Sequence, residues 1–188
     1  MELAQLLSSQ DLIVWDGYAQ ASLCLDLRQD LLSVGGVSAA VGSERRVDAS
    51  VRGDSIRWLD GSTQVQTKIL QELERIKTEL NQQCFLGLKT VEAHYAHYPK
   101  GGFYQKHVDR VRNSEGRVVT FILYLNSSWK TGDGGELKIY SRWNDENPSL
   151  IIEPIAGRLV MFLSDRVIHE VAETKKPRFS LTGWFRRD

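Results

Sequence analysis

The stretch RVVTFILYLNSSWKTGDGGELKIY, residues 117–140, decides the fold. An apolar run rich in β-branched residues is followed by a glycine-rich turn and a second short apolar run, which is typical of two connected strands. Six further runs of this kind lie at residues 88–98, 103–111, 149–154, 157–163, 167–171 and 178–185. Eight short strands separated by turn residues predict two facing antiparallel sheets, as in a jelly-roll or cupin-like barrel.

The residues before this β-rich half predict helices. Apolar side chains recur at spacings of three and four over residues 19–33 and, more clearly, over residues 63–81, which indicates two amphipathic helices. The positions that carry these stripes are Leu23, Leu27, Leu31, Val65, Ile69, Leu73, Ile76 and Leu80. Residues 2–10 predict a shorter helix and residues 12–18 a strand. We expect the helices to pack on the outside of one sheet, so the predicted fold class is α+β.

Composition limits the class of protein. The 188 residues predict one domain, with residues 1–87 as helical support and substrate loop and residues 88–188 as the β-barrel core. Lys plus Arg and Asp plus Glu both number 24, so no global field favours nucleic acid or a membrane as partner. Two distant cysteines form no disulfide framework, and no apolar stretch approaches the ~18 to 20 residues of a membrane span. We expect a soluble, cytoplasmic monomer.

Three side chains predict a metal site. In KHVDR, residues 106–110, His107 and Asp109 are two positions apart, so on a strand they project from the same face. His169 lies on a late strand that a closed barrel can place beside this early one. Two imidazoles and a carboxylate with open positions suit non-haem Fe(II), although zinc also accepts such ligands. His94 and His97, three apart on a strand, face opposite ways, and we expect both to be half-buried polar residues.

Arg178, in KKPRFSLTGWF, gives this site a context. It follows His169 after a turn, so we expect it on the neighbouring strand. Burying the charge of an arginine inside a barrel costs folding free energy unless an anion pairs with it. The two parallel N–H donors of the guanidinium match the two oxygens of a carboxylate. Tyr124 could add a hydroxyl to the same anion. The alternative is that Arg178, like most arginines, is a surface residue.

The order of these motifs resembles the Fe(II)- and 2-oxoglutarate-dependent oxygenases. His107-x-Asp109, His169 and then Arg178 nine positions later follow that superfamily's pattern. YPKGGFYQKHVD, RVVTFILYLNSSW, GGELKIY and SDRVIHEV resemble its prolyl hydroxylase branch. The upstream VRGDSIRWLDG resembles the oxygen-sensing prolyl hydroxylases and their bacterial relatives.

The resemblance implies a role for each matching position. It implies that iron is held by His107, Asp109 and His169. It implies that 2-oxoglutarate is bound by Arg178, whose partner is the 5-carboxylate, and by Tyr98, Tyr124 and Thr182. It implies that substrate is contacted by Arg52, Asp54, Arg117 and Trp184. The segment RRVDASVRGDSIRW, residues 45–58, would then act as a lid over the substrate.

The implied fold is a double-stranded β-helix, and the implied activity is that of a peptidyl-proline 4-dioxygenase. Fe(II), 2-oxoglutarate and O2 are the expected cofactor and co-substrates, with ascorbate as reductant. The expected partner is a protein with a target proline, such as a translation factor. Two alternatives stay open: the same chemistry on another amino-acid side chain or a small metabolite, and a non-enzymatic cupin-like module that holds a metal or a sugar.

Overall fold

The computed structural model describes residues 11–38, 50–109 and 116–188 as two facing antiparallel sheets with two helices on one side. The major sheet has seven strands in the order β1-β9-β6-β11-β4-β3-β2, and the minor sheet has four in the order β5-β10-β7-β8. The bounds in the major sheet are β1 Leu12–Trp15, β2 Val37–Ser38, β3 Ser55–Trp58, β4 Thr90–Tyr98, β6 Arg117–Tyr124, β9 Leu159–Leu163 and β11 Arg178–Arg186. Those in the minor sheet are β5 Tyr104–His107, β7 Leu137–Tyr140, β8 Leu150–Ile152 and β10 Ile168–Val171. All eight strands predicted after residue 87 are present, and the α+β prediction is confirmed.

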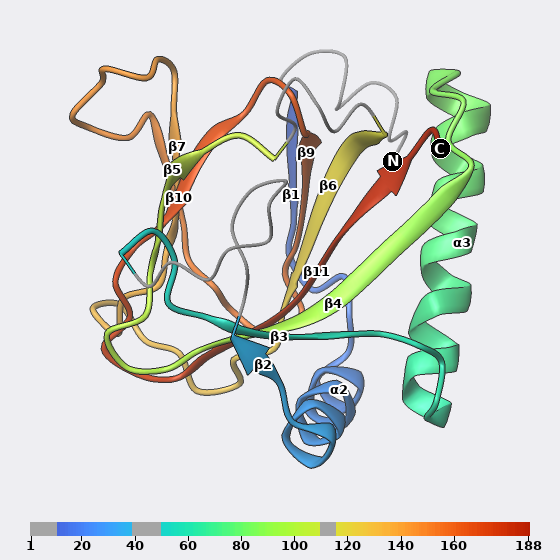
Figure 1. Ribbon diagram of the computed structural model, residues 1–188, viewed down its shortest axis with the longest axis horizontal. Helices are drawn as coiled ribbons and strands as arrows, with labels where there is room; N and C mark the ends of the chain where they lie inside the picture. The colour runs from blue at the N-terminus through green and yellow to red at the C-terminus, as the bar shows by residue number, and fades with distance from the viewer. Residues whose placement is uncertain (1–10, 39–49, 110–115) are drawn as a thin grey trace.

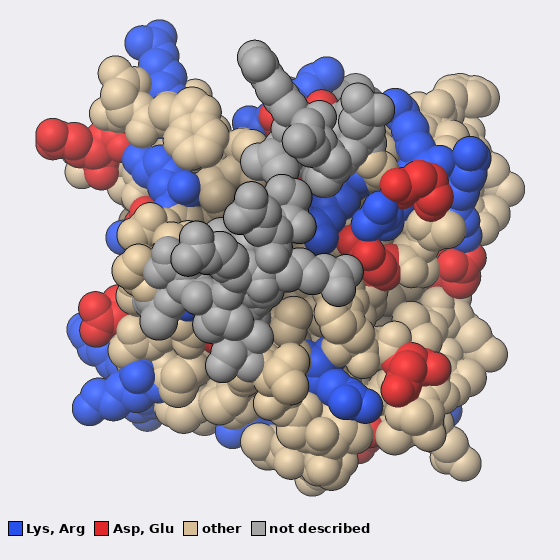
Figure 2. Space-filling view, viewed as in Figure 1, with Lys and Arg blue, Asp and Glu red and all other residues tan. Residues whose placement is uncertain are grey.

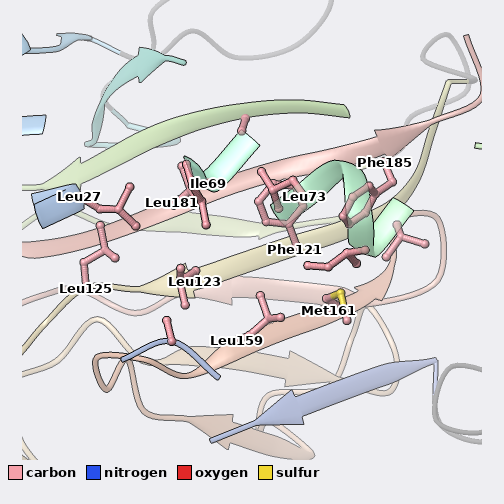
Figure 3. Packing of buried hydrophobic residues seen from close by; sticks show 14 of the residues in the cluster. Leu27, Ile69, Leu73, Phe121, Leu123, Leu125, Leu159, Met161, Leu181 and Phe185 are labelled. Atoms are coloured by element: carbon pink, nitrogen blue, oxygen red, sulfur yellow. The ribbon is translucent and has the colours of Figure 1, made fainter. Parts of the chain in front are cut away.

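The two described helices, α2 (Ala21–Val34) and α3 (Gln64–Cys84), cover the outer face of the major sheet (Figure 1). Both match the predicted amphipathic segments, and neither is long and apolar enough to cross a membrane. Their apolar stripes pack on outward-facing side chains of β4, β6, β9 and β11, as Figure 3 shows for Leu27, Ile69 and Leu73 against Phe121 and Leu181. The predicted helix at residues 2–10 lies outside the described residues.

A buried polar cluster ties these helices to the sheet. The Asp30 carboxylate on α2 accepts hydrogen bonds from Gln66 Nε2 on α3 at 2.9 Å and from Tyr95 Oη on β4 at 2.8 Å. Gln66 Oε1 in turn accepts from the backbone N–H groups of Asp60 and Gly61. Each of these buried polar groups therefore has a partner, which fixes how the helices sit on the sheet.

The inner face of the major sheet packs against the minor sheet, and the candidate active site lies between the two sheets. Strand alternation on β4 sends Tyr95 outward to the helices, whereas Ala96 and Tyr98 join a second core between the sheets. The other buried members of that second core include Ile122, Tyr124, Leu137, Val160, Phe162 and Val171. On the outer surface basic and acidic side chains are interspersed, as Figure 2 shows for one face.

Candidate active site

His107, Asp109 and His169 converge at the end of the minor sheet. In the antiparallel pair of β5 and β10, His107 is the direct register partner of His169. The Nε2 atoms of His107 and His169 lie 3.4 Å and 3.8 Å from Asp109 Oδ1, and one ligand atom of each residue lies within 4.8 Å of the others. The structure therefore brings together the three residues that the sequence predicted as metal ligands.

Neighbouring groups orient these three ligands. The Nδ1 atoms of His107 and His169 hydrogen bond to the carbonyls of Gln105 at 2.7 Å and Val167 at 3.0 Å. An Nδ1–H that donates to a carbonyl leaves the Nε2 lone pair free for a metal. Asp109 Oδ2 accepts from Thr120 Oγ1 on β6 at 2.7 Å, which leaves Oδ1 facing the imidazoles.

The protonation states suit a cation. Burial, followed by the charge of His107, lowers the pKa of His169 to about 4. Burial alone would raise the pKa of Asp109, but the imidazoles of His169 and His107 and the hydroxyl of Thr120 hold that pKa well below its usual range. Neutral imidazole and ionised carboxylate are the forms that bind a metal, and this donor set with open positions fits Fe(II).

Arg178 lies buried on the inner face of the major sheet, with 2% of its surface exposed. Its Nε donates to the carbonyl of Gly135 at 2.9 Å and its Nη1 to Ser180 Oγ at 3.3 Å. The guanidinium carbon lies 4.9 Å from the ring centroid of Tyr98 and 5.1 Å from that of Tyr124. No carboxylate among the described residues forms an ion pair with Arg178, and Tyr124 Oη is buried without a hydrogen-bond partner there. A buried cation close to an unpaired hydroxyl fits a carboxylate ligand.

Thr182 continues this polar row along β11. Its hydroxyl lies 3.3 Å from Ser180 Oγ, so Arg178, Ser180 and Thr182 form one chain of contacts. All four residues predicted to bind 2-oxoglutarate thus lie on this inner face, with Tyr98 and Tyr124 against the guanidinium and Thr182 reached through Ser180.

The residues predicted to contact substrate fall into two groups. Arg52 and Asp54 pair with each other through contacts of 2.6 Å and 2.7 Å, and the Arg52 guanidinium lies 4.4 Å from the Tyr104 ring centroid. Arg117 lies 3.5 Å from the Trp184 ring centroid and forms an ion pair with Glu92 at 3.2 Å.

The predicted lid is only partly described. Its residues 45–49 lie outside the described residues. Its later part runs beside β5, where Gly53 N–H donates to the carbonyl of Phe103 at 2.9 Å.

Sequence reasoning missed three residues of this region. The hydroxyl of Thr120 donates a hydrogen bond to Asp109, and the carbonyl of Gly135 accepts one from Arg178. The first contact depends on how the strands are aligned, and the second joins residues that are 43 positions apart in the chain. His94 was predicted to be half-buried but is only 4% exposed, because Trp58 and Trp184 cover its ring. No local sequence signal marks these contacts, since the partners are far apart in the chain.

A double-stranded β-helix with a His-Asp-His cluster and a buried arginine between its two sheets defines the class of Fe(II)- and 2-oxoglutarate-dependent oxygenases. The family model of the 2OG-Fe(II) oxygenase superfamily matches residues 93–186. The chain belongs to this superfamily, whose metal and co-substrates are Fe(II), 2-oxoglutarate and O2.

Several of the similar proteins are prolyl hydroxylases. A prolyl-4-hydroxylase from Pseudomonas putida superimposes with a TM-score of 0.87 at 33% identity, over 99% of this chain and 97% of that one. A prolyl hydroxylase from Trichoplax adhaerens, solved with a hypoxia inducible factor peptide, gives 0.85 at 26% identity over 99% and 88%. Human prolyl hydroxylase EGLN3 is 33% identical over 145 residues, which cover 72% of this chain. The chain spans 59% of the length of that human relative.

Proposed function

We propose that this protein is a prolyl hydroxylase that oxidises C4 of a proline within a polypeptide. The observation that carries the proposal is that the His107, Asp109 and His169 cluster and the buried Arg178 both lie between the two facing sheets, where no carboxylate of the described residues pairs with the arginine. The likeness to the Pseudomonas putida prolyl-4-hydroxylase over nearly both whole chains supports prolyl over other substrates. A metal-binding module without activity has no use for a buried guanidinium beside open coordination positions.

The chain's own contribution is to bind, orient and exclude water. Gly135 and Ser180 aim the guanidinium of Arg178 so that it can pair with the 5-carboxylate of 2-oxoglutarate. Thr120 holds Asp109 so that one carboxylate oxygen faces the metal position. When bound, iron supplies the O2 chemistry by which 2-oxoglutarate becomes succinate and CO2, with one oxygen atom entering succinate and the other entering the prolyl C–H bond.

The proposal also covers the substrate protein, the oligomeric state and the cellular compartment. We propose a protein substrate, in keeping with the peptide bound to the Trichoplax relative. The target that we propose is a translation factor, because the sequence resembles bacterial relatives of the oxygen-sensing prolyl hydroxylases. We further propose that the enzyme is monomeric and cytoplasmic and uses ascorbate as reductant. Incubation of lysate proteins with the iron-loaded enzyme, followed by mass spectrometry, should find one added oxygen on proline. Oxygen gained only by lysine or by a small metabolite would overturn the prolyl assignment.

Arg178 gives the mechanistic test. Arg178→Ala should raise the KM for 2-oxoglutarate in succinate formation, because losing a charge-assisted pair in a dry pocket typically costs about 2 to 5 kcal/mol. Arg178→Lys should restore only part of the affinity, since lysine lacks the planar fork. Iron affinity should stay near the wild-type value. The matched control is Arg75→Ala on the exposed face of α3. An unchanged KM in Arg178→Ala would contradict the proposed co-substrate site.

A further inference from the structure

Strand β5 is irregular next to a candidate metal ligand. In its antiparallel pairing with β10, His107 is opposite His169. Tyr104, three positions earlier on β5, is opposite Val171, only two positions later on β10, so β5 contains a β-bulge. On a regular strand, side chains three positions apart project from opposite faces. The bulge breaks this alternation, and the rings of Tyr104 and His107 stack with centroids 3.7 Å apart and 22° between their planes.

The residues that precede β3 pair with this bulge. Gln105, inside the bulge, donates its backbone N–H to the Val51 carbonyl at 2.9 Å. Gly53 N–H donates to the Phe103 carbonyl, also at 2.9 Å. Residues 50–53, which we call the docking segment, therefore lie along β5, the edge strand of the minor sheet.

Two series of contacts lead from the docking segment to His107. In the first, the Arg52 guanidinium lies 4.4 Å from the centroid of the Tyr104 ring, and this ring stacks on the imidazole. In the second, the Val51 carbonyl holds Gln105, whose own carbonyl contacts His107 Nδ1 at 2.7 Å. Stacking restrains the plane of the imidazole and the carbonyl restrains its Nδ1 atom. Together they aim Nε2 of His107 at Asp109.

We infer that docking of residues 50–53 on β5 orients His107 and thereby raises the metal affinity of the site. Arg52 and Tyr104 are then positioning residues, because they act on a metal ligand through contacts with its ring. Groups that orient a ligand typically change metal affinity by about 10- to 100-fold. Coupling between two binding events is reciprocal, so metal binding must in turn favour the docked segment. This inference concerns the metal site and does not depend on prolyl hydroxylation.

The dissociation constant for Mn(II) tests the inference without 2-oxoglutarate or substrate. Electron paramagnetic resonance of the free ion gives this constant. Tyr104→Leu, which removes the stacked ring, should raise it about tenfold. Arg52→Gln, which removes the cation but leaves a hydrogen-bond donor for Asp54, should raise it about two- to fivefold. Tyr104→Phe keeps the ring and should stay within about twofold of the wild type.

A double-mutant cycle tests whether Arg52 acts through Tyr104. The effect of Arg52→Gln on the dissociation constant should largely disappear in the Tyr104→Leu background. Effects that simply add would contradict the proposed route from Arg52 to His107.

Lys106→Met is the matched control on the same strand. The Lys106 ammonium lies 3.6 Å from the Tyr140 ring centroid and 2.8 Å from the Asp145 carbonyl, so this substitution removes a different cation–π contact of β5. It should lower the free energy of unfolding in urea and keep the wild-type dissociation constant for Mn(II). A rise equal to that in Tyr104→Leu would mean that any loosening of β5 weakens the site, and it would overturn the inference.

Hydrogen exchange tests the coupling in the reverse direction. Saturating Zn(II), which accepts the same ligands, should slow exchange of the Gly53 and Gln105 backbone N–H groups about tenfold in the wild type. In Tyr104→Leu the slowing should be less than about twofold. Equal exchange with and without Zn(II), or wild-type Mn(II) affinity in both Tyr104→Leu and Arg52→Gln, would make this inference wrong while the proposed function stands. If the wild type binds no Mn(II), both are wrong.

Discussion

Substituting Gly135 by alanine should weaken 2-oxoglutarate binding indirectly, by displacing the side chain of Arg178. Gly135 has φ +77°, and a Cβ built there would lie 2.8 Å from Cδ of Arg178. An ordinary contact needs at least 3.4 Å, so Arg178 must move by 0.6 Å or more (3.4 − 2.8). The carbonyl of Gly135 also holds Arg178 Nε at 2.9 Å, so the arginine loses its anchor as it moves.

Two costs follow from this substitution and can be measured separately. The left-handed backbone conformation costs an alanine ~1 to 2 kcal/mol of folding free energy. A displaced guanidinium loses part of its paired hydrogen bonds, and a misplacement near 1 Å can cost up to about a hundredfold in activity. We therefore expect the KM for 2-oxoglutarate to rise about 10- to 100-fold. Succinate formation at varied 2-oxoglutarate gives the KM, and urea denaturation gives the free energy of unfolding.

Gly132 provides the control within the same turn. It has φ +95°, and an added Cβ would meet no atom within 4 Å. Gly132→Ala should lose a similar free energy of unfolding and keep the wild-type KM for 2-oxoglutarate. Equal KM values in the two variants would refute the reasoning that Gly135 positions Arg178.

Three further outcomes are expected. Asp109→Ala should abolish succinate formation and iron binding, measured by activity and by metal content after gel filtration, and near-normal values would mean that the metal site is placed wrongly. Asp30→Ala should lower the free energy of unfolding by about 2 to 4 kcal/mol in urea, because Tyr95 and Gln66 lose their buried acceptor, and a loss below about 0.5 kcal/mol would contradict this. Burial lowers the pKa of His94 to about 3. As the pH falls below 6.5, His94 is therefore protonated in the unfolded chain but stays neutral in the folded protein, which lowers the free energy of unfolding. Metal-free His94→Phe should therefore lose about 2 kcal/mol less stability than the wild type between pH 7 and pH 5, and equal losses would show that His94 can be protonated in the fold.

Local patterns predicted most of the fold. Turn residues between short apolar runs located all eight strands of the second half, and the stripes around Leu27 and Leu73 located both described helices. Spacing also predicted that His107 and Asp109 share a face. The pairing of His107 with His169 needed the closed barrel, which the alternation of short strands implied.

Other features depended on information that a local pattern does not hold. The contact of Arg178 with Gly135 joins segments 43 residues apart through a turn with positive φ. The burial of His94 depends on Trp58 and Trp184, which only the register of three strands places beside it. Such contacts follow from tertiary geometry, so they become visible only when the sheets are assembled.

The candidate metal site is built from residues that both sheets hold in place, and this affects how much folded protein is present in the cell. His107 and His169 belong to the minor sheet, whereas Asp109 is fixed by Thr120 of the major sheet. An ion that contacts all three residues binds the folded protein more tightly than the unfolded chain, so it stabilises the folded state by mass action. Iron at a hundred times its dissociation constant adds up to about 2.7 kcal/mol to the free energy of unfolding. Scarcity of iron would therefore lower the amount of folded protein, and the abundance of the protein in the cell would follow the supply of its metal.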